Sequence, residues 1–163
     1  MTLALLAALA MYSPLAYGAT KQQNMPVQSQ VAVNCSFRAA SSLNFLGYDP
    51  NGVNSTVPLD QTALLQISCT RGATTTIGID SGTHAGQTSF GTRALADGTK
   101  YLGYDIYQDS VRTILWSNAG AGIYNYVSPS SLPTNISIYG RIFASQNVPA
   151  GIYTDTLVIT INY

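Results

Sequence analysis

Few side chains in this sequence are of the types that carry out catalysis. The 163 residues include one histidine, His84, seven Asp and no Glu. A serine hydrolase would need His84 to activate a serine, but no Gly-x-Ser-x-Gly nucleophile turn is present. Two carboxylates could serve a glycosidase, but Asp49 and Asp97 precede Pro50 and Gly98, where they are typical turn formers. We therefore expect no catalytic residue and interpret His84 as an exposed loop histidine.

The sequence also lacks the motifs that bind phosphates, dinucleotides or metal ions. Its two cysteines, Cys35 and Cys69, have no further Cys or His near them in sequence, which disfavours a metal site. An even pair of cysteines in an exported protein typically forms a disulfide. The bond would close a loop of about 35 residues and contribute roughly 3–4 kcal/mol in the chain-entropy model. We expect a Cys35–Cys69 disulfide and no cofactor.

The composition narrows the class of protein. Charged residues make up only 9% of the chain and the net charge is zero. Nucleic-acid binding needs a basic surface, which this composition does not supply. Ordinary soluble domains carry about 25% charged residues. A low charge with many Ser, Thr, Asn and Gly favours a single domain that packs against its own kind outside the cell.

Residues 1–18 have the pattern of a secretory signal peptide. An apolar run at residues 3–11 is too short to span a membrane, and Pro14 ends it. Ala16 and Gly18 place small residues three and one before a cut after Gly18. No Lys or Arg precedes the apolar run, which departs from the usual pattern. We expect an exported protein whose mature chain has no membrane-spanning helix.

The rest of the chain alternates short β-branched stretches with Gly- and Pro-rich turns, and no stretch keeps a helical period of 3.6 residues. Strands are expected at residues 43–46, 62–70, 74–80, 101–108, 112–116 and 136–143. Loops are expected at residues 81–91 and 120–132, and a hairpin turn at residues 97–98. About seven short strands and one disulfide predict an all-β sandwich, with immunoglobulin-like topology as the natural candidate.

The last eleven residues, 153–163, have the most regular pattern in the chain. Their apolar face consists of Leu157, Ile159, Ile161 and Tyr163. Val158, Thr160 and Asn162 alternate with them, as expected of a strand with one buried face. The sequence supplies no later strand to pair with the far side, and an exposed apolar edge promotes aggregation. We expect another segment to cover this edge.

A second alternating segment lies near the N-terminus and has no evident partner. Its apolar face consists of Met25, Val27, Ser29, Val31 and Val33. Pro26 cannot donate to a β-ladder, which argues against a central strand. If this segment paired with the uncovered edge of a neighbouring copy, its four apolar side chains would contribute roughly 6–12 kcal/mol gross. Such a head-to-tail contact does not close, so it would grow a filament.

Several motifs, taken in chain order, resemble those of the spore coat protein U family, which includes the subunits of archaic chaperone–usher pili. They are LNFLGYDP at residues 43–50, ISCT at 67–70, IGIDSG at 77–82, RALADGTKYLGYDIYQD at 93–109, YGR at 139–141 and GIYTDTLVITINY at 151–163. These motifs span nearly the whole mature chain. Leu46 departs from the family pattern, in which Phe tends to run directly into Gly.

The resemblance implies an incomplete immunoglobulin-like sandwich, residues 35–163, that lacks its final strand and is completed by donor-strand exchange. It implies that residues 19–34 are the donor-strand extension, with Met25, Val27, Ser29, Val31 and Val33 as its donor residues. The implied acceptor groove and chaperone or subunit contact consists of Leu157, Ile159, Ile161 and Tyr163. The terminal carboxylate of Tyr163 would anchor basic residues of the chaperone.

The resemblance also implies partners and a location. A periplasmic chaperone would lend a strand to the groove, and an outer-membrane usher would exchange it for the extension of a neighbouring pilus subunit. The protein would then be a structural subunit of a pilus at the cell surface, serving attachment or biofilm formation.

The residues alone leave other interpretations open. A C-terminal alternating strand is ordinarily a core strand, and an N-terminal one ordinarily pairs within its own sheet. The chain would then be a monomeric secreted sandwich that binds carbohydrate through loop Tyr and Trp side chains. A small outer-membrane β-barrel also has alternating strands and a terminal aromatic residue, although the strands here are short and irregular. A complete sandwich should be soluble and stable alone, whereas an incomplete one should not.

Overall fold

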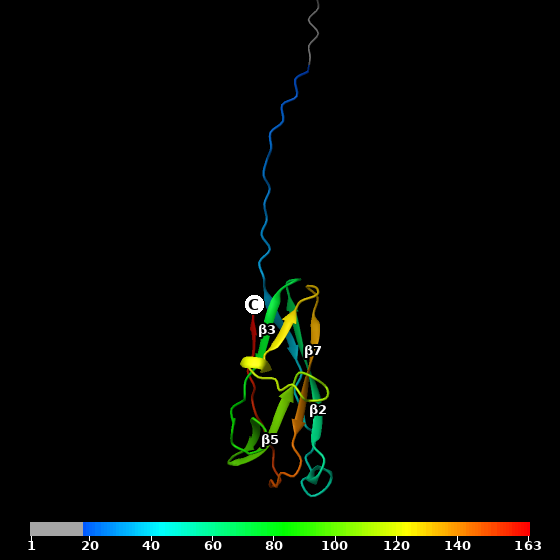
Figure 1. Ribbon diagram of the computed structural model, residues 1–163, viewed down its shortest axis with the longest axis vertical. Helices are drawn as coiled ribbons and strands as arrows, with labels where there is room; N and C mark the ends of the chain where they lie inside the picture. The colour runs from blue at the N-terminus through cyan, green and yellow to red at the C-terminus, as the bar shows by residue number, and fades with distance from the viewer. Residues whose placement is uncertain (1–17) are drawn as a thin grey trace, which may run out of the picture. The chain divides into compact units, whose positions relative to one another are not determined.

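The computed structural model describes residues 18–163, so the predicted signal peptide lies almost wholly outside the described residues. Residues 32–163 form one compact unit, which we name the body. Residues 18–31 are extended and exposed, with no assigned secondary structure (Figure 1). Within residues 18–163, no helix has the length and apolar character that crossing a membrane requires.

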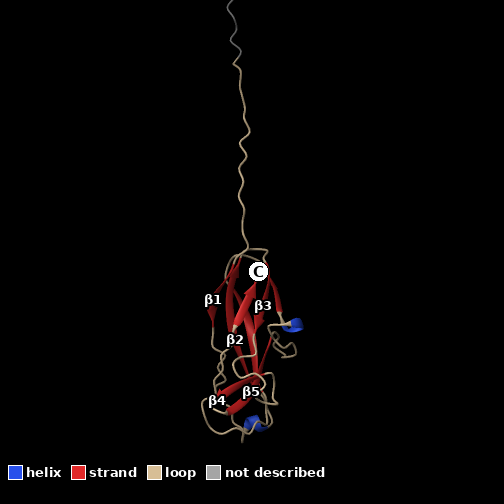
Figure 2. Cartoon of the chain, turned by 90° about the vertical axis from the view of Figure 1, so that its left-hand side faces the viewer, coloured by secondary structure: helices blue, strands red, loops and turns tan. Residues whose placement is uncertain are grey.

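The body is a sandwich of two antiparallel sheets (Figures 1 and 2). One sheet has five strands in the order β1-β2-β7-β5-β4, and the other has three in the order β6-β3-β8. The elements are β1 (Cys35–Ala40), η1 (Val53–Ser55), β2 (Leu59–Cys69), β3 (Thr74–Ile79), β4 (Arg93–Asp97), β5 (Lys100–Tyr107), η2 (Gly120–Gly122), β6 (Tyr124–Val127), β7 (Thr134–Ile142) and β8 (Ile159–Asn162). The all-β sandwich expected from the sequence is confirmed.

The core lies between the two sheets and is built from alternate residues of their strands. Leu65 and Ile67 of β2 and Ile77 and Ile79 of β3 are all at most 1% exposed. Successive side chains of a strand point to opposite faces. A strand with one face against the core therefore has buried apolar side chains at every second position. Trp116 fills the space between the sheets, and its indole nitrogen donates to the Ile77 carbonyl at 2.9 Å.

One cation, Arg93 at the start of β4, is buried in this core and is 1% exposed. Its guanidinium donates to the carbonyls of Asp80 at 2.9 Å, Ile79 at 3.1 Å and Trp116 at 2.7 Å. The carboxylate of Asp105 lies 3.8 Å away. A buried charge is tolerated only when it is paired and hydrogen-bonded, and here both conditions hold. Arg93 thus joins the five-stranded sheet to β3 of the other sheet.

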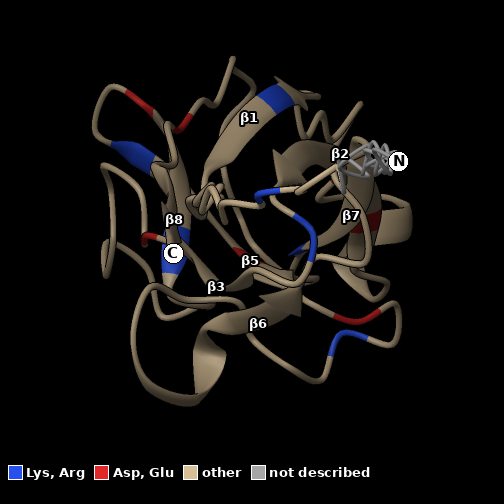
Figure 3. Cartoon of the chain, turned by 90° about the horizontal axis from the view of Figure 1, so that it is seen from above, with Lys and Arg blue, Asp and Glu red and all other residues tan. Residues whose placement is uncertain are grey.

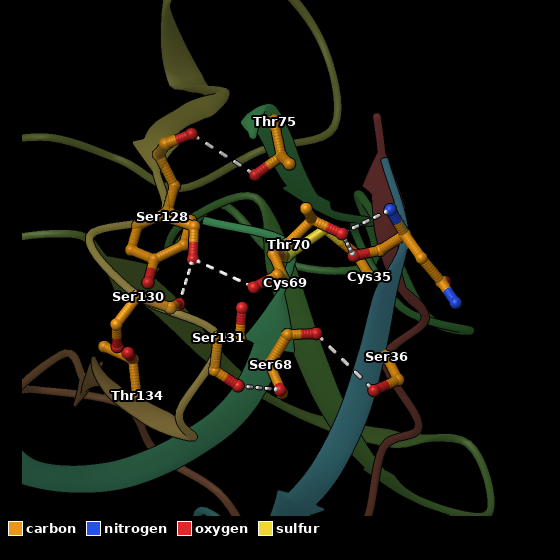
Figure 4. The surroundings of a disulfide bond; sticks show 12 residues. Cys35, Ser36, Ser68, Cys69, Thr70, Thr75, Ser128, Ser130, Ser131 and Thr134 are labelled. Carbon is orange, nitrogen blue, oxygen red and sulfur yellow. Dashed lines mark hydrogen bonds between the residues drawn. A yellow bond between two sulfur atoms is a disulfide. The ribbon is translucent and has the colours of Figure 1, made fainter. Parts of the chain in front are cut away.

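The expected disulfide between Cys35 and Cys69 is present, and it joins the first residue of β1 to the last of β2 (Figure 4). Next to it, the Asn34 amide donates to the Thr70 hydroxyl at 3.1 Å, and the Thr70 amide donates to the Asn34 carbonyl at 2.9 Å. The chain therefore enters the body at a point that is fixed by one covalent bond and by hydrogen bonds of Asn34 to the hydroxyl and the amide of Thr70.

Four predicted strands and one predicted turn are confirmed within a few residues. The strands expected at residues 62–70, 74–80, 101–108 and 136–143 correspond to β2, β3, β5 and β7. The hairpin turn expected at Asp97 and Gly98 joins β4 to β5. Gly98 has a φ of 58°, a left-handed conformation that glycine adopts at no steric cost.

The strand predicted at residues 112–116 is wrong, because this segment is a loop. The carboxylate of Asp109 accepts the amides of Thr113 at 3.0 Å and Ile114 at 2.7 Å, which folds the chain back on itself. Arg112 adopts a φ of 59°, which a regular strand excludes. Leu115 alone forms an isolated bridge, with Tyr107 of β5.

Two further expectations need correction. The segment expected as a loop at residues 120–132 contains β6, which pairs with β3. The short strand expected at residues 43–46 is irregular, although its alternate residues Leu43 and Phe45 do point inward. They pack against Gly140 of β7, where an added Cβ would meet both side chains at under 3 Å. The alternation was therefore informative about burial and not about hydrogen bonding.

Candidate strand-binding groove

The sandwich is open along one side, where each sheet has an edge strand. Within residues 18–163, β1 pairs only with β2, and β8 pairs only with β3. The start of β1 and the end of β8 lie at the same end of the body (Figures 1 and 2). The two edges therefore run in opposite directions, and each presents backbone N–H and C=O groups without a sheet partner.

Three adjoining cavities lie along this open side, and we name them together the edge groove. The first has about 300 Å³ and is lined by Phe37, Arg38, Ala39, Ala40, Leu65 and Ile159. The second has about 360 Å³ and shares Ala40 and Ile159 with the first. The third has about 780 Å³ and shares Phe45 and Leu95 with the second. The shared residues show that the three cavities lie next to one another.

The floor of the edge groove is the core itself. Leu65, Ile79, Tyr104 and Ile138 line its cavities, and each is a core residue at most 7% exposed. A strand laid between the two sheets would place its inward residues against these side chains. A strand with an apolar residue at every second position would fill the groove and continue the core.

The C-terminal wall of the groove is not one continuous strand, so the strand predicted over residues 153–163 is only partly correct. Only Ile159–Asn162 form β8, while Thr154 makes a separate bridge with Ala96 of β4, with N–O distances of 2.8 and 3.0 Å. This wall therefore starts against the five-stranded sheet and ends in the three-stranded sheet. Its alternation is kept throughout: Tyr153, Asp155, Leu157, Ile159 and Ile161 are half-buried between exposed neighbours.

The structure brings together two of the four predicted acceptor residues in the groove. Leu157 and Ile159 line the second cavity. Ile161 packs against the core, and Tyr163 is 61% exposed. The opposite wall, residues 37–45, was not predicted. The alternating apolar residues Phe37, Leu43 and Phe45 were the signal that could have indicated it.

The predicted donor residues are exposed. Met25, Val27 and Val31 are 80–82% exposed and Val33 is 51% exposed, and Ser29 is exposed with them. Large apolar side chains gathered on one exposed segment indicate a binding partner more often than chance. Their role as donor residues remains a prediction.

Charge contributes little to this surface. The Lys, Arg and Asp residues of the body are spread thinly over its strands and loops (Figure 3). The best-organised surface ion pair lies elsewhere, on β2 and β7, where Arg141 holds Asp60 at 2.7 and 2.8 Å. This pair lowers the pKa of Asp60, against the opposing effect of burial. In the edge groove, two charged residues, Arg38 and Asp155, line the first and second cavities among mainly apolar neighbours.

A cluster of polar side chains borders the second cavity, centred on Asp155, whose side chain is 1% exposed. Its carboxylate accepts the Thr83 hydroxyl at 2.7 Å, the Thr83 amide at 2.9 Å and the Tyr104 hydroxyl at 2.8 Å. Burial raises the pKa of Asp155, but these hydrogen bonds outweigh it and hold the pKa below its ordinary value. The carboxylate therefore stays ionised and ties the loop after β3 to the C-terminal wall.

His84 belongs to this cluster and is half-buried, which corrects the expectation of an exposed loop histidine. Its Nδ1 lies 2.9 Å from the Thr83 hydroxyl and 3.4 Å from the carboxylate of Asp155. A catalytic triad needs the hydroxyl at one ring nitrogen and the carboxylate at the other. Here both face the same nitrogen, and the hydroxyl donates to the carboxylate. Within residues 18–163, no group of three or more His, Cys or Asp side chains is placed to hold a metal ion.

The position of Asp155 predicts a pH dependence of stability. Its folded-state pKa is lowered, so the ionised carboxylate contributes stability above the unfolded value of about 3.9 and loses it as the pH falls through the folded value. We expect Asp155→Asn to cost about 1.5–3 kcal/mol at pH 7. Thermal unfolding from pH 7 to pH 2 should show the gap to the wild type closing below about pH 4. Asp97→Asn, on the exposed hairpin, is the matched control, and a gap that stays constant with pH would contradict the prediction.

Comparison with known proteins places this chain in a family. The sequence profile of the Spore Coat Protein U domain matches residues 21–160. The chain belongs to the spore coat protein U family. It is 34% identical over 167 residues to "Protein U" of Myxococcus xanthus, a match that covers 96% of this chain and 92% of that protein. The family expected from the motifs is thus confirmed.

The fold is also similar to that of a solved structure. A chain of the CsuC–CsuE chaperone–tip adhesion subunit pre-assembly complex, from the archaic chaperone-usher Csu pili of Acinetobacter baumannii, matches with a TM-score of 0.58 and 19% identity. The match covers 82% of this chain and 40% of that chain, so this chain spans less than half of it. At this identity the similarity concerns the fold, and it confirms the immunoglobulin-like sandwich expected for this member of the spore coat protein U family.

Proposed function

We propose that this protein is a structural subunit of an extracellular pilus assembled by the chaperone–usher pathway through donor-strand complementation. The observation that carries the proposal is the edge groove, which opens onto the core between β1 and β8. Residues 19–34 of the same chain hold an exposed apolar face with the period of a strand. Within residues 18–163, the edge groove lacks a strand between β1 and β8, and residues 19–34 have the pattern of a strand that could fill it.

Assembly follows from repeating this contact. The extension of one copy fills the edge groove of the next, main-chain hydrogen bonds extend both edges, and the side chains fill the three cavities. Each copy donates its extension to one neighbour and accepts the extension of another neighbour in its edge groove. Because these are two different surfaces, the contact does not close on itself and a fibre grows. The subunit is therefore a structural protein rather than an enzyme in this proposal.

The partners proposed for the free subunit follow from the same open groove. Before assembly, a periplasmic chaperone covers the groove with a strand of its own, and an outer-membrane usher exchanges that strand for the extension of a neighbouring subunit. The similarity in fold to a chain of a chaperone–subunit pre-assembly complex supports a chaperone as the first partner. The completed pilus lies at the cell surface, where it serves attachment or biofilm formation.

Charges placed on the apolar face of the extension should test the proposal. We expect Val27→Asp with Val31→Asp in the full chain to abolish fibres, because two carboxylates would have to be buried in an apolar groove. Gln28→Asp with Gln30→Asp adds the same charge to the opposite face and is the matched control, which should keep its fibres. Electron microscopy and size-exclusion chromatography of the secreted protein provide the measurement. Fibres from the Val27 and Val31 variant would refute donor-strand assembly.

A further inference from the structure

The last residues of the N-terminal extension are hydrogen-bonded to the body of their own chain. The Asn34 amide donates to the Thr70 hydroxyl at 3.1 Å, and the Thr70 amide donates to the Asn34 carbonyl at 2.9 Å. The Thr70 hydroxyl in turn donates to the Ala32 carbonyl at 3.2 Å. We name residues 32–34 the root. One side chain, that of Thr70, thus contacts both ends of the root.

The root continues the pairing of β1 with β2 past the disulfide. Asn34 and Thr70 lie opposite each other, one pair beyond the two bonded cysteines. The chain of β2 goes no further in this direction, because Gly72 turns it toward β3 with a φ of 79°. The next hydrogen bond therefore comes from the Thr70 side chain, which reaches the carbonyl of Ala32.

The exposure of the extension changes at the root. Met25, Val27 and Val31 are 80–82% exposed, whereas Val33 is 51% exposed. Val33 also belongs to the compact unit of residues 32–163, which begins one residue after Val31. Its lower exposure therefore reflects contact with its own body. A hydrophobic side chain that is already half covered gains less from entering a neighbour's groove.

The hydrogen bonds of the root restrict where it can pair. A strand that fills the edge groove lies between β1 and β8, so its backbone has to pair on both sides. In an extended chain, the N–H and C=O groups of residues two apart point to the same side. Thr70 already occupies the side of Ala32 and Asn34. The root cannot enter a neighbour's groove without breaking these bonds, whereas a free copy of the same residues has no such restraint.

We propose that the donated strand ends at Val31 and that the root stays on its own body in the fibre, so that consecutive bodies are joined without a free linker. This inference rests on the proposed donor-strand assembly and narrows it. Of the predicted donor residues, Val33 then belongs to the joint between bodies and not to the donated face. Thr70 is the positioning residue of that joint.

A carboxylate placed on either side of the boundary tests the inference in the full chain. We expect Val31→Asp to lose its fibres, because the charge would have to be buried in the neighbour's groove. Val33→Asp makes the same change two residues further along and should keep its fibres, because a side chain half exposed on its own body leaves the charge in water. Electron microscopy of the secreted proteins provides the measurement, and the Cys35–Cys69 bond reports folding.

The outcomes separate this inference from the proposed function. Loss of fibres with Val31→Asp alone supports the root. Loss of fibres with Val33→Asp, in a folded body, overturns the root and keeps donor-strand assembly, because the donated strand would then include Val33. Fibres from both variants would overturn both proposals.

Amide hydrogen exchange in the fibres tests the root without changing the donated strand. Thr70→Val removes the hydroxyl and nearly keeps the shape, while Thr70→Ser keeps the hydroxyl. In the root, Thr70→Val removes the acceptor of the Asn34 amide, so this amide should exchange about tenfold faster than in the wild type. Thr70→Ser should exchange like the wild type. If Asn34 is paired in a neighbour's groove instead, its exchange is the same in all three proteins, and this result overturns the inference.

Discussion

We expect residues 35–163 to melt at least about 15 °C higher when the missing strand is supplied on the same chain than when it is absent. The change is to remove residues 1–34 and to append a copy of residues 20–34 after Tyr163 through a short flexible linker. The appended Met25, Val27, Val31 and Val33 would contribute roughly 6–12 kcal/mol gross by leaving water. A domain of this size gains about 2–8 °C for each kcal/mol. Thermal unfolding of the oxidised proteins, followed by circular dichroism, provides the measurement.

The control for this experiment is the same protein with Val27→Asp and Val31→Asp in the appended copy. It has the same length and linker, so it should melt like residues 35–163 alone and should aggregate as they do. If all three proteins are soluble monomers that melt together, the sandwich is already complete. A stand-alone secreted domain would then be the better interpretation of the chain.

The second large effect is expected at Arg93. Replacing it by Met removes the donors to three carbonyls, those of Ile79, Asp80 and Trp116, and leaves the Asp105 carboxylate without its neighbouring cation. Breaking a buried ionic arrangement from one side costs about 3–5 kcal/mol, which is a large part of the stability of an ordinary domain. We expect Arg93→Met to unfold at a much lower urea concentration than the wild type, as monitored by Trp116 fluorescence.

Arg71→Met is the matched control, because Arg71 lies exposed in the turn between β2 and β3. It removes the same charge and should change the urea midpoint little. Arg93→Lys should fall between the two, since an ammonium cannot direct donors along the three directions that the guanidinium serves. Equal midpoints for Arg93→Met and Arg71→Met would show that the buried network contributes nothing to the folded body.

The sequence was most informative where strands are long and turns are marked. β2 and β3 combine β-branched residues with the turn at Arg71 and Gly72, and the β4–β5 hairpin has Asp97 and Gly98, so local chemistry was sufficient to predict them. β6 has only four residues between Gly- and Ser-rich segments, too few for a period to show. In residues 112–116, the amides of Thr113 and Ile114 donate to the Asp109 carboxylate and not to a neighbouring strand, so no strand forms.

The groove was predicted from one side only. The alternation of Leu157 and Ile159 was visible in the sequence, and so was the apolar face of the extension. The opposite wall depends on β1 being an edge of the five-stranded sheet, and on Leu43 and Phe45 lying over Gly140 of a strand nearly a hundred residues further along. The hydrogen bonds of Asp155 with Thr83 and Tyr104 likewise join residues distant in sequence. Contacts of this kind have no local signature.

The disulfide has a mechanical consequence for a fibre built in the proposed way. A pull on such a fibre travels along residues 19–34 and reaches the body at Cys35, the first residue of β1. Cys35 is bonded covalently to Cys69, so the load passes at once into β2, which is paired with β7 from Leu59 to Ile67. The load that the extension brings into the body is therefore shared by β1 and β2 from their joined ends onward. A body with Cys35 and Cys69 reduced would have to carry this load through β1 and through hydrogen bonds alone.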